Sequence, residues 1–268
     1  MRGVWLIALT TYKEGIRNRI LLGIFFCALI LCAFNLIFTD MFSHELSKVA
    51  VDVGLSVVSL SGLLTIFFMG MNLMAKDMDK RTIYMVLARP LSRSQYVLGK
   101  FIGISLLVLT TVGLLGLVTT GSVKWAMLRA PDFIPPHFSW ATFAASLLCQ
   151  SLSLIVLVSI AILFTVITSS SFMAVLMTIA SYLIGQNVES VRRMALQPGS
   201  EQVFVVKKLV LFVSWIFPNL EAFDLKTSAA YGLAINMREL AWASLHGTAY
   251  AALILLVAVV VFKRKELT

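Results

Sequence analysis

Apolar runs of about 20 residues recur along this chain, and they restrict its fold more than any other feature. A helix needs roughly 20 apolar residues to cross the hydrocarbon core of a bilayer. Of the 268 residues, 59% are hydrophobic and only 13% are charged, and the mean hydropathy is +0.93. The sequence therefore predicts an all-α membrane protein that crosses the bilayer several times.

Six runs have the length of a spanning helix. They cover residues 20–38, 50–74, 95–122, 140–168, 171–190 and 239–262. One further apolar stretch, LVLFVSWIF at 209–217, has only nine residues and is too short to span. We expect it to form a re-entrant or interfacial helix within a region, 191–238, that precedes the last span. The prediction is a single transmembrane domain over residues 1–268.

The first 19 residues have the pattern of an amphipathic helix. Apolar side chains recur at helical spacing at Trp5, Leu9, Tyr12 and Ile16. Thr10, Glu14 and Arg17 share another face. Such a helix is expected to lie in the membrane interface rather than to cross it.

The distribution of charge supports an even number of spans. Six spans place both termini on one side. If that side is cytoplasmic, the inner segments hold 13 Lys and Arg against four Asp and Glu, and the outer segments hold nine of each. The whole net charge of +9 then falls on the inner face, as the positive-inside bias predicts. We expect a protein of the cytoplasmic (inner) membrane with both termini inside. The basic composition therefore does not call for a nucleic-acid partner.

The segment between the second and third apolar runs is crowded with ionised side chains. Seven charges lie there, on Lys76, Asp77, Asp79, Lys80, Arg81, Arg89 and Arg93. At about 2.5–3.5 kcal/mol for each charge at the bilayer centre, burial of all seven would cost on the order of 20 kcal/mol. Residues 76–92 are therefore expected to lie in water or among lipid headgroups.

The same segment has the pattern of a short helix with a defined end. The spacing i, i+3, i+4 is occupied by Ile83, Val86 and Leu87. Pro90 disfavours helical geometry at the residue before it. Ser92 and Gln95 then match a capping box that starts the next helix. A helix held in this way can transmit a push from a soluble partner into the membrane. A solvated connector with a basic flank is the alternative that the pattern leaves open.

Residues 74–100 resemble the segment that follows the second span in ABC-2 type permeases of ABC transporters. The matching runs are DKRTIY at 79–84, VLARPLSR at 86–93 and YVLGK at 96–100. The amphipathic start, RNR at 17–19, the six spans and PNLEAFD at 218–224 extend the resemblance over most of the chain. It is closest to the six-span branch that includes permeases associated with nitrous oxide reductase and multicopper enzyme maturation.

The resemblance implies a specific organisation. Residues 1–19 would be an elbow helix, 76–92 a cytoplasmic coupling helix seated on an ATPase subunit, and 191–238 would hold extracytoplasmic re-entrant helices. The residues that it assigns to the ATPase interface are Asp79, Arg81, Thr82, Ile83, Tyr84, Val86, Leu87, Arg89 and Pro90. The implied partners are an ABC ATPase, a second permease copy or paralogue, and membrane lipid.

Sites for nucleotides, metals and catalysis are not apparent in the sequence. A phosphate-binding G-x-x-x-x-G-K-[ST] loop would be needed for ATP, and the nearest approach, Gly116 to Gly121, lacks the lysine. We therefore expect no cofactor on this chain, with ATP and Mg²⁺ bound by a partner ATPase, and no enzymatic activity of its own. The three cysteines lie within apolar runs without metal-ligand spacing, and a methionine cluster at 69–78 indicates packing more than copper binding.

Hydroxyl and amide side chains suggest a path through the bundle. They share helical faces of the second and fifth spans, at Ser61, Thr65, Asn72, Thr178, Ser181, Tyr182 and Gln186. Small and hydroxyl residues also serve close helix packing in lipid, which is the competing interpretation. Gly99 and Gly103 form one such small-residue pair.

The sequence thus favours the permease subunit of an ABC exporter, whose substrate the residues do not identify. A non-transporting membrane anchor or assembly subunit that docks soluble proteins on the same basic face is the alternative. A secondary transporter would predict an inverted repeat or a charge at mid-bilayer, and neither is apparent in the sequence.

Overall fold

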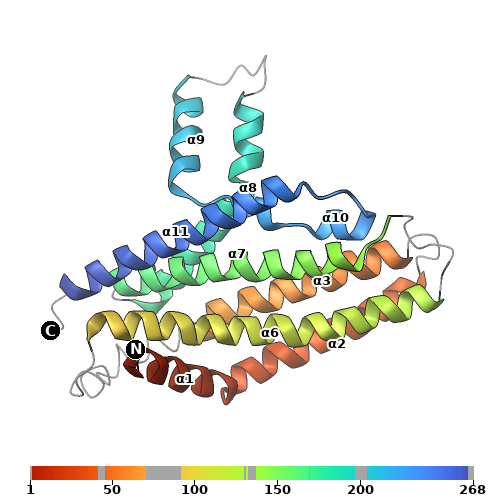
Figure 1. Ribbon diagram of the computed structural model, residues 1–268, viewed down its shortest axis with the longest axis horizontal. Coiled ribbons are helices and arrows are strands. Elements are labelled where there is room, and N and C mark those ends of the chain that lie inside the picture. Colours follow the sequence, from red (N-terminus) through yellow and green to blue (C-terminus); the bar gives the residue numbers. More distant parts are fainter. Residues whose placement is uncertain are drawn as a thin grey trace.

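The computed structural model describes residues 2–41, 46–70, 92–129, 131, 137–168, 170–196 and 204–264. All regular elements in these ranges are helices (Figure 1). They are α1 (Arg2–Ile16), α2 (Arg19–Met41), α3 (Leu46–Leu64), the π-helix η1 (Thr65–Gly70), α6 (Arg93–Arg129), α7 (Trp140–Ile167), α8 (Ser171–Leu196), α9 (Phe204–Ile216), the 3₁₀ helix η3 (Glu221–Phe223), α10 (Lys226–Tyr231) and α11 (Met237–Arg264).

The predicted spans coincide with long helices. Five helical segments of the described chain are long and apolar enough to cross a membrane, namely 48–68, 93–129, 140–167, 171–196 and 237–264. The pair of α1 and α2, bent by 58°, makes a sixth where the two helices are counted as one broken span. The short run at 209–217 falls largely in α9, which has 13 residues. The polytopic all-α fold expected from the apolar runs is confirmed.

Two helices extend by six residues or more past the predicted ends of their apolar runs. The run predicted to end at residue 122 continues to Arg129, because no Gly or Pro interrupts it before Pro131. The run predicted to end at residue 190 continues to Leu196. Its polar last turns are supported by ion pairs from Glu189 to residues three and four positions later. Hydropathy alone marks the apolar part of such a helix and misses its polar extension.

The packing centre is α6. It contacts α1, α2, α3, α7 and α11, and α7 packs in turn against α11 (Figure 1). The largest buried cluster joins α3, α6 and α7 through residues such as Val58, Leu115 and Leu157, which are at most 1% exposed. Figure 1 also shows the end of α8 and α9 side by side above the other helices. Consecutive long helices from α6 to α8 alternate in direction.

The face of α1 that packs on α6 differs from its predicted apolar stripe. Ala8, Thr11 and Gly15 are buried, whereas Trp5 is 55% exposed and Ile16 is 41% exposed. Small side chains form much of the contact between α1 and α6 because they let two helix backbones approach closely. Of the predicted stripe, Trp5 is exposed, whereas the hydroxyl of Tyr12 is hydrogen-bonded to Thr110 of α6.

Candidate coupling site

The predicted coupling helix itself lies outside the residues that the structure describes, except for Ser92. This applies to every residue assigned to the ATPase interface, from Asp79 to Pro90. Their role stays a prediction. The described chain does define the two helix ends that flank the segment, which are Gly70 at the end of η1 and Arg93 at the start of α6. Both ends, with the two termini, lie at the same end of the bundle (Figure 1).

The start of α6 is capped as the sequence predicts. The backbone N–H of Ser92 donates to Oε1 of Gln95 at 3.1 Å. The backbone N–H of Gln95 donates in return to the Ser92 hydroxyl at 3.3 Å. These reciprocal bonds form a capping box, which satisfies donors that a helix N-terminus otherwise leaves unpaired. Residue 92 is therefore a firm boundary from which α6 begins.

The first turn of α6 is fastened to the last turn of α11. Arg93 Nη1 donates to the carbonyl oxygens of Phe262 and Lys263, at 3.3 and 3.1 Å. One turn along, the ring of Tyr96 stacks on the ring of Phe262 with centroids 5.7 Å apart and planes 22° apart. Both rings are only 1% exposed. We call Arg93, Tyr96, Phe262 and Lys263 the basal clamp. The last carbonyl groups of a helix have no hydrogen-bond donor within the helix. In the basal clamp, the Arg93 guanidinium supplies that donor to the C-terminal end of α11.

Helix α1 is bound to the same part of α6. A Cβ atom added to Gly99 would lie 2.6 Å from Cβ of Ile7, and one added to Gly103 would lie 2.8 Å from the carbonyl oxygen of Ala8. Only glycine permits this approach, so the small-residue pair seen in the sequence has a structural role. Further along, the hydroxyls of Tyr12 and Thr110 are hydrogen-bonded at 3.0 Å. Helices α1, α6 and α11 therefore form one packed unit.

A buried lysine completes this unit. Lys100 is only 4% exposed, and its ammonium lies 5.8 Å from the centre of the Tyr96 ring. A cation over an aromatic face is stabilised by the ring quadrupole, more strongly when water is excluded. The sequence suggested only a basic flank here. It gave no signal that this cation would be buried beside the basal clamp.

Span two ends in a π-helix. The six residues of η1 follow α3 directly, and Thr65 and Ile66 are fully buried. η1 contacts α2, α6, α7 and α8 as well as α3. π-helices are rare and are frequent at functional sites. Nothing in the sequence TIFFMG predicted this element, which lies where span two meets the charged segment.

Four of the predicted path residues have their hydroxyls bonded within their own helices. Each donates to the carbonyl oxygen four residues earlier at 2.8 Å, and they are Ser61, Thr65, Thr178 and Ser181. All four are at most 3% exposed. Tyr182 packs against the main core cluster, and Gln186 is half-buried. Asn72 lies outside the described residues. A role in a translocation path stays a prediction for this set.

A polar cavity of about 410 Å³ lies at the end of the bundle opposite the basal clamp. It is lined by residues from the end of α8, the segment around η3 and the start of α11, including Arg193, Asn219, Glu221, Asp224, Asn236 and Glu239. The wall is internally tied, since the Glu221 carboxylate accepts from the backbone N–H and the hydroxyl of Ser190 at 3.2 and 3.0 Å. The sequence indicated a polar end at 186–193. It did not indicate that Glu221 of η3 would be hydrogen-bonded to Ser190 at this end of α8.

Metal ligands do not converge in the described part of the chain, where no group of three or more His, Cys, Asp and Glu side chains could hold an ion. A capped 37-residue helix is fixed at its start to the first and last helices of the chain.

A comparison with protein families finds a match over nearly the whole chain. The family described as "ABC-2 family transporter protein" covers residues 5–267, from the first turns of α1 to beyond the end of α11. No curated protein matches the chain.

Proposed function

The chain belongs to the ABC-2 transporter family and is thus a membrane component of an ABC transporter; from this premise we propose that it is the permease subunit of an exporter. A separate nucleotide-binding subunit hydrolyses ATP with Mg²⁺ and grips residues 76–92. A second copy or a paralogue of this chain completes the membrane part. The branch associated with nitrous oxide reductase and multicopper enzyme maturation is the subgroup that the 74–100 motif favours.

The basal clamp is the observation that supports coupling through this segment. A force applied to residues 76–92 enters α6 at Ser92, where the capping box prevents the first turn from fraying. Arg93 passes it to α11, and the Gly99 and Gly103 contacts pass it to α1. At about 1.5 Å per residue, α6 carries the displacement over roughly 56 Å. A small movement of a partner is thereby delivered to the far end of the bundle.

Charge supports the orientation. Placing the basal end in the cytoplasm assigns the entire net charge of +9 to the inner side, as loops near spanning helices favour Lys and Arg inside. In this orientation, α1 lies in the inner interface and α9 with η3 forms the extracytoplasmic region before the last span. The polar cavity at Glu221 then opens on the outer side, where an exported substrate would leave.

The test is loss of the ATPase from the purified complex. The chain is purified in mild detergent from its own host, and co-purifying ATPase subunits are quantified by mass spectrometry. Ile83→Asp and Val86→Asp place a charge on the apolar stripe of the predicted coupling helix. We expect both to release the ATPase while the unfolding temperature of the permease stays as in the wild type.

The matched control is Leu233→Asp, at a 52% exposed position in the loop before α11 at the opposite end. It is expected to retain the ATPase. If no ATPase accompanies the wild-type chain, or if both coupling variants retain it, the proposal fails. An ATPase that binds but shows no transport-linked stimulation in liposomes would favour the alternative, a membrane anchor.

A further inference from the structure

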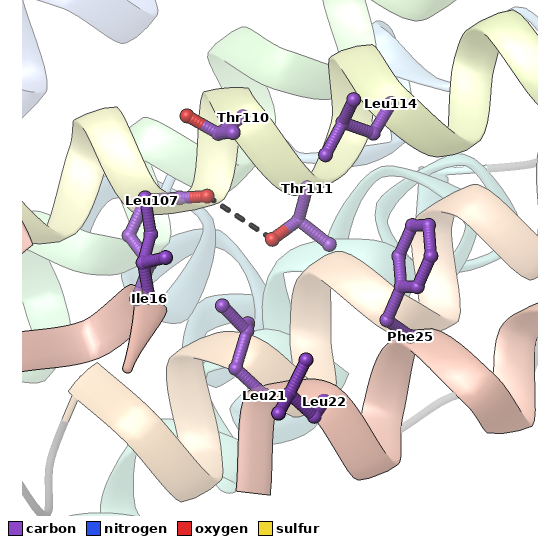
Figure 2. A pocket seen from close by; sticks show the side chains of 8 residues that line it. All are labelled: Ile16, Leu21, Leu22, Phe25, Leu107, Thr110, Thr111 and Leu114. Atoms are coloured by element: carbon purple, nitrogen blue, oxygen red, sulfur yellow. Dashed lines mark hydrogen bonds between the residues drawn. The ribbon is translucent and has the colours of Figure 1, made fainter. Parts of the chain in front are cut away.

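The bend between α1 and α2 encloses a cavity of about 230 Å³ against α6. Figure 2 shows Leu21, Leu22 and Phe25 of α2 facing Leu107, Thr111 and Leu114 of α6 across it, with Ile16 of α1 at one side. The cavity is smaller than the roughly 300–1,000 Å³ of pockets that enclose drug-sized ligands. It suits a narrow, flexible chain.

The wall of this cavity offers no free polar group from its two threonines. The Thr111 hydroxyl donates to the carbonyl oxygen of Leu107 at 3.0 Å (Figure 2). The Thr110 hydroxyl donates to the carbonyl of Leu106 at 2.8 Å and is also bonded to Tyr12. The remaining six lining side chains are apolar. A ligand here would therefore be held by dispersion and by exclusion of water, as hydrocarbon is.

The cavity opens outward and extends along the helices. Leu22 and Leu114, on opposite walls, are 51% and 49% exposed. The α6 wall runs from Leu107 to Leu114, a length of about 10 Å. Because the surrounding surface belongs to membrane-spanning helices, the hydrocarbon that reaches this opening is a lipid tail.

Three cations lie close in sequence to the lining residues of α1 and α2. The turn that joins α1 and α2 consists of Arg17 and Asn18, and Arg19 begins α2. Arg17 and Arg19 are exposed, as is Lys13 one turn earlier on α1, while Glu14 is the acidic neighbour. Two net positive charges thus lie within a few residues of the lining positions Ile16 and Leu21. Basic groups near a membrane surface attract anionic lipids.

We propose that this cavity is a binding site for one anionic phospholipid, whose acyl chain fills the space between α2 and α6 while Arg17 and Arg19 hold its phosphate. The site goes beyond the transport function, since it requires neither the ATPase nor a substrate. Bound there, the lipid fills the space between the elbow, span one and α6. It would thereby stabilise the junction of α1 and α2 against the helix that begins at the basal clamp.

Native mass spectrometry of the full-length chain tests the site. The purified protein is titrated with dioleoyl phosphatidylglycerol or with dioleoyl phosphatidylcholine, which share their acyl chains and differ in headgroup charge. We expect the first phosphatidylglycerol to bind on the order of tenfold more tightly, because its headgroup has a net negative charge facing the arginines, whereas the choline cation of phosphatidylcholine offsets its phosphate. The double variant Arg17→Gln/Arg19→Gln should abolish this preference. Lys124→Gln/Arg129→Gln, at the other end of α6, should keep it.

Filling the cavity tests the acyl chain separately. Leu114→Trp should weaken the first bound lipid whatever its headgroup. Leu117→Trp on the same helix, at a 73% exposed position outside the lining, should leave binding unchanged. Thermal unfolding of each lipid-free variant serves as the folding control. The charge variants alter exposed side chains, so they remain informative if a tryptophan variant fails to fold.

Three outcomes would overturn the proposal. Equal affinity for the two lipids would show that the site does not select an anionic headgroup. A preference that survives loss of both arginines would show that Arg17 and Arg19 do not provide that selection. A preference that depends on the arginines but is insensitive to Leu114→Trp, in a folded variant, places the lipid on the surface and leaves the cavity without a function.

Discussion

Removal of the Arg93 side chain provides a direct measure of the basal clamp. Arg93 donates to two carbonyl oxygens in the last turn of α11, at 3.3 and 3.1 Å. Hydrogen bonds from charged groups are worth about 1.5–3 kcal/mol when formed well. Because the bond to Lys263 is exposed and one donor atom serves both carbonyls, we expect Arg93→Gln to cost the last turn of α11 about 1–3 kcal/mol.

Hydrogen–deuterium exchange is the suitable assay, because the loss is local. If the last turn opens by fraying, 1–3 kcal/mol corresponds to an increase of about 5- to 150-fold in exchange at residues 259–264. The middle of α11 should be unaffected, since Ala251 and Leu255 remain buried in the bundle. Global unfolding should change little, because Tyr96 and Phe262 still stack.

The control for this prediction is Arg238→Gln, an exposed arginine in the first turn of the same helix. This variant also replaces an arginine by glutamine, but at the opposite end of α11, away from the basal clamp. An exchange rate at 259–264 that stays within twofold of the wild type in Arg93→Gln would refute the clamp. So would an equal increase in the Arg238 variant.

Two further predictions concern the contacts at either end of the bundle. Gly103→Ala would place a Cβ atom 2.8 Å from the backbone oxygen of Ala8, so overpacking should lower the free energy of unfolding by about 1–3 kcal/mol in a thermal unfolding assay. The control is Gly113→Ala, whose Cβ would have open space around it. In the same assay, it should be neutral or slightly stabilising. Glu221→Ala removes the acceptor of Ser190. It should increase hydrogen–deuterium exchange in residues 186–196 by a factor of about 2 to 10, as expected for an exposed pair of bonds. Unchanged exchange there would mean that other contacts hold η3 against α8.

The helices on the two sides of the charged segment differ in structure, with the π-helix η1 before it and the capped, clamped start of α6 after it. After it, the chain enters a capped helix that is fastened to α1 and α11. Before it, the chain leaves a π-helix, in which the hydrogen-bond spacing of span two has already changed. We infer that displacement of residues 76–92 is transmitted mainly into α6.

Local sequence patterns predicted the helices well because they depend on neighbours along the chain. The run at 140–168 became Trp140–Ile167, and the Ser92 to Gln95 capping box formed with both of its hydrogen bonds. The break between α1 and α2 was also visible, since RNR at 17–19 interrupts the apolar pattern where the two helices meet. Each of these features is set by side chains within a turn or two of one another.

The contacts that give the bundle its candidate functions are different in kind. Arg93 meets carbonyl groups 169 and 170 residues away, and the lipid cavity joins α2 to α6. Hydropathy could not pair these helices, because lipid tails are as apolar as the helix surfaces and every span can satisfy its own backbone bonds. The sequence therefore determined which segments are helices in a membrane and where the charge lies. Only the tertiary structure decided which small residues let two backbones meet, and hence which helices pack together.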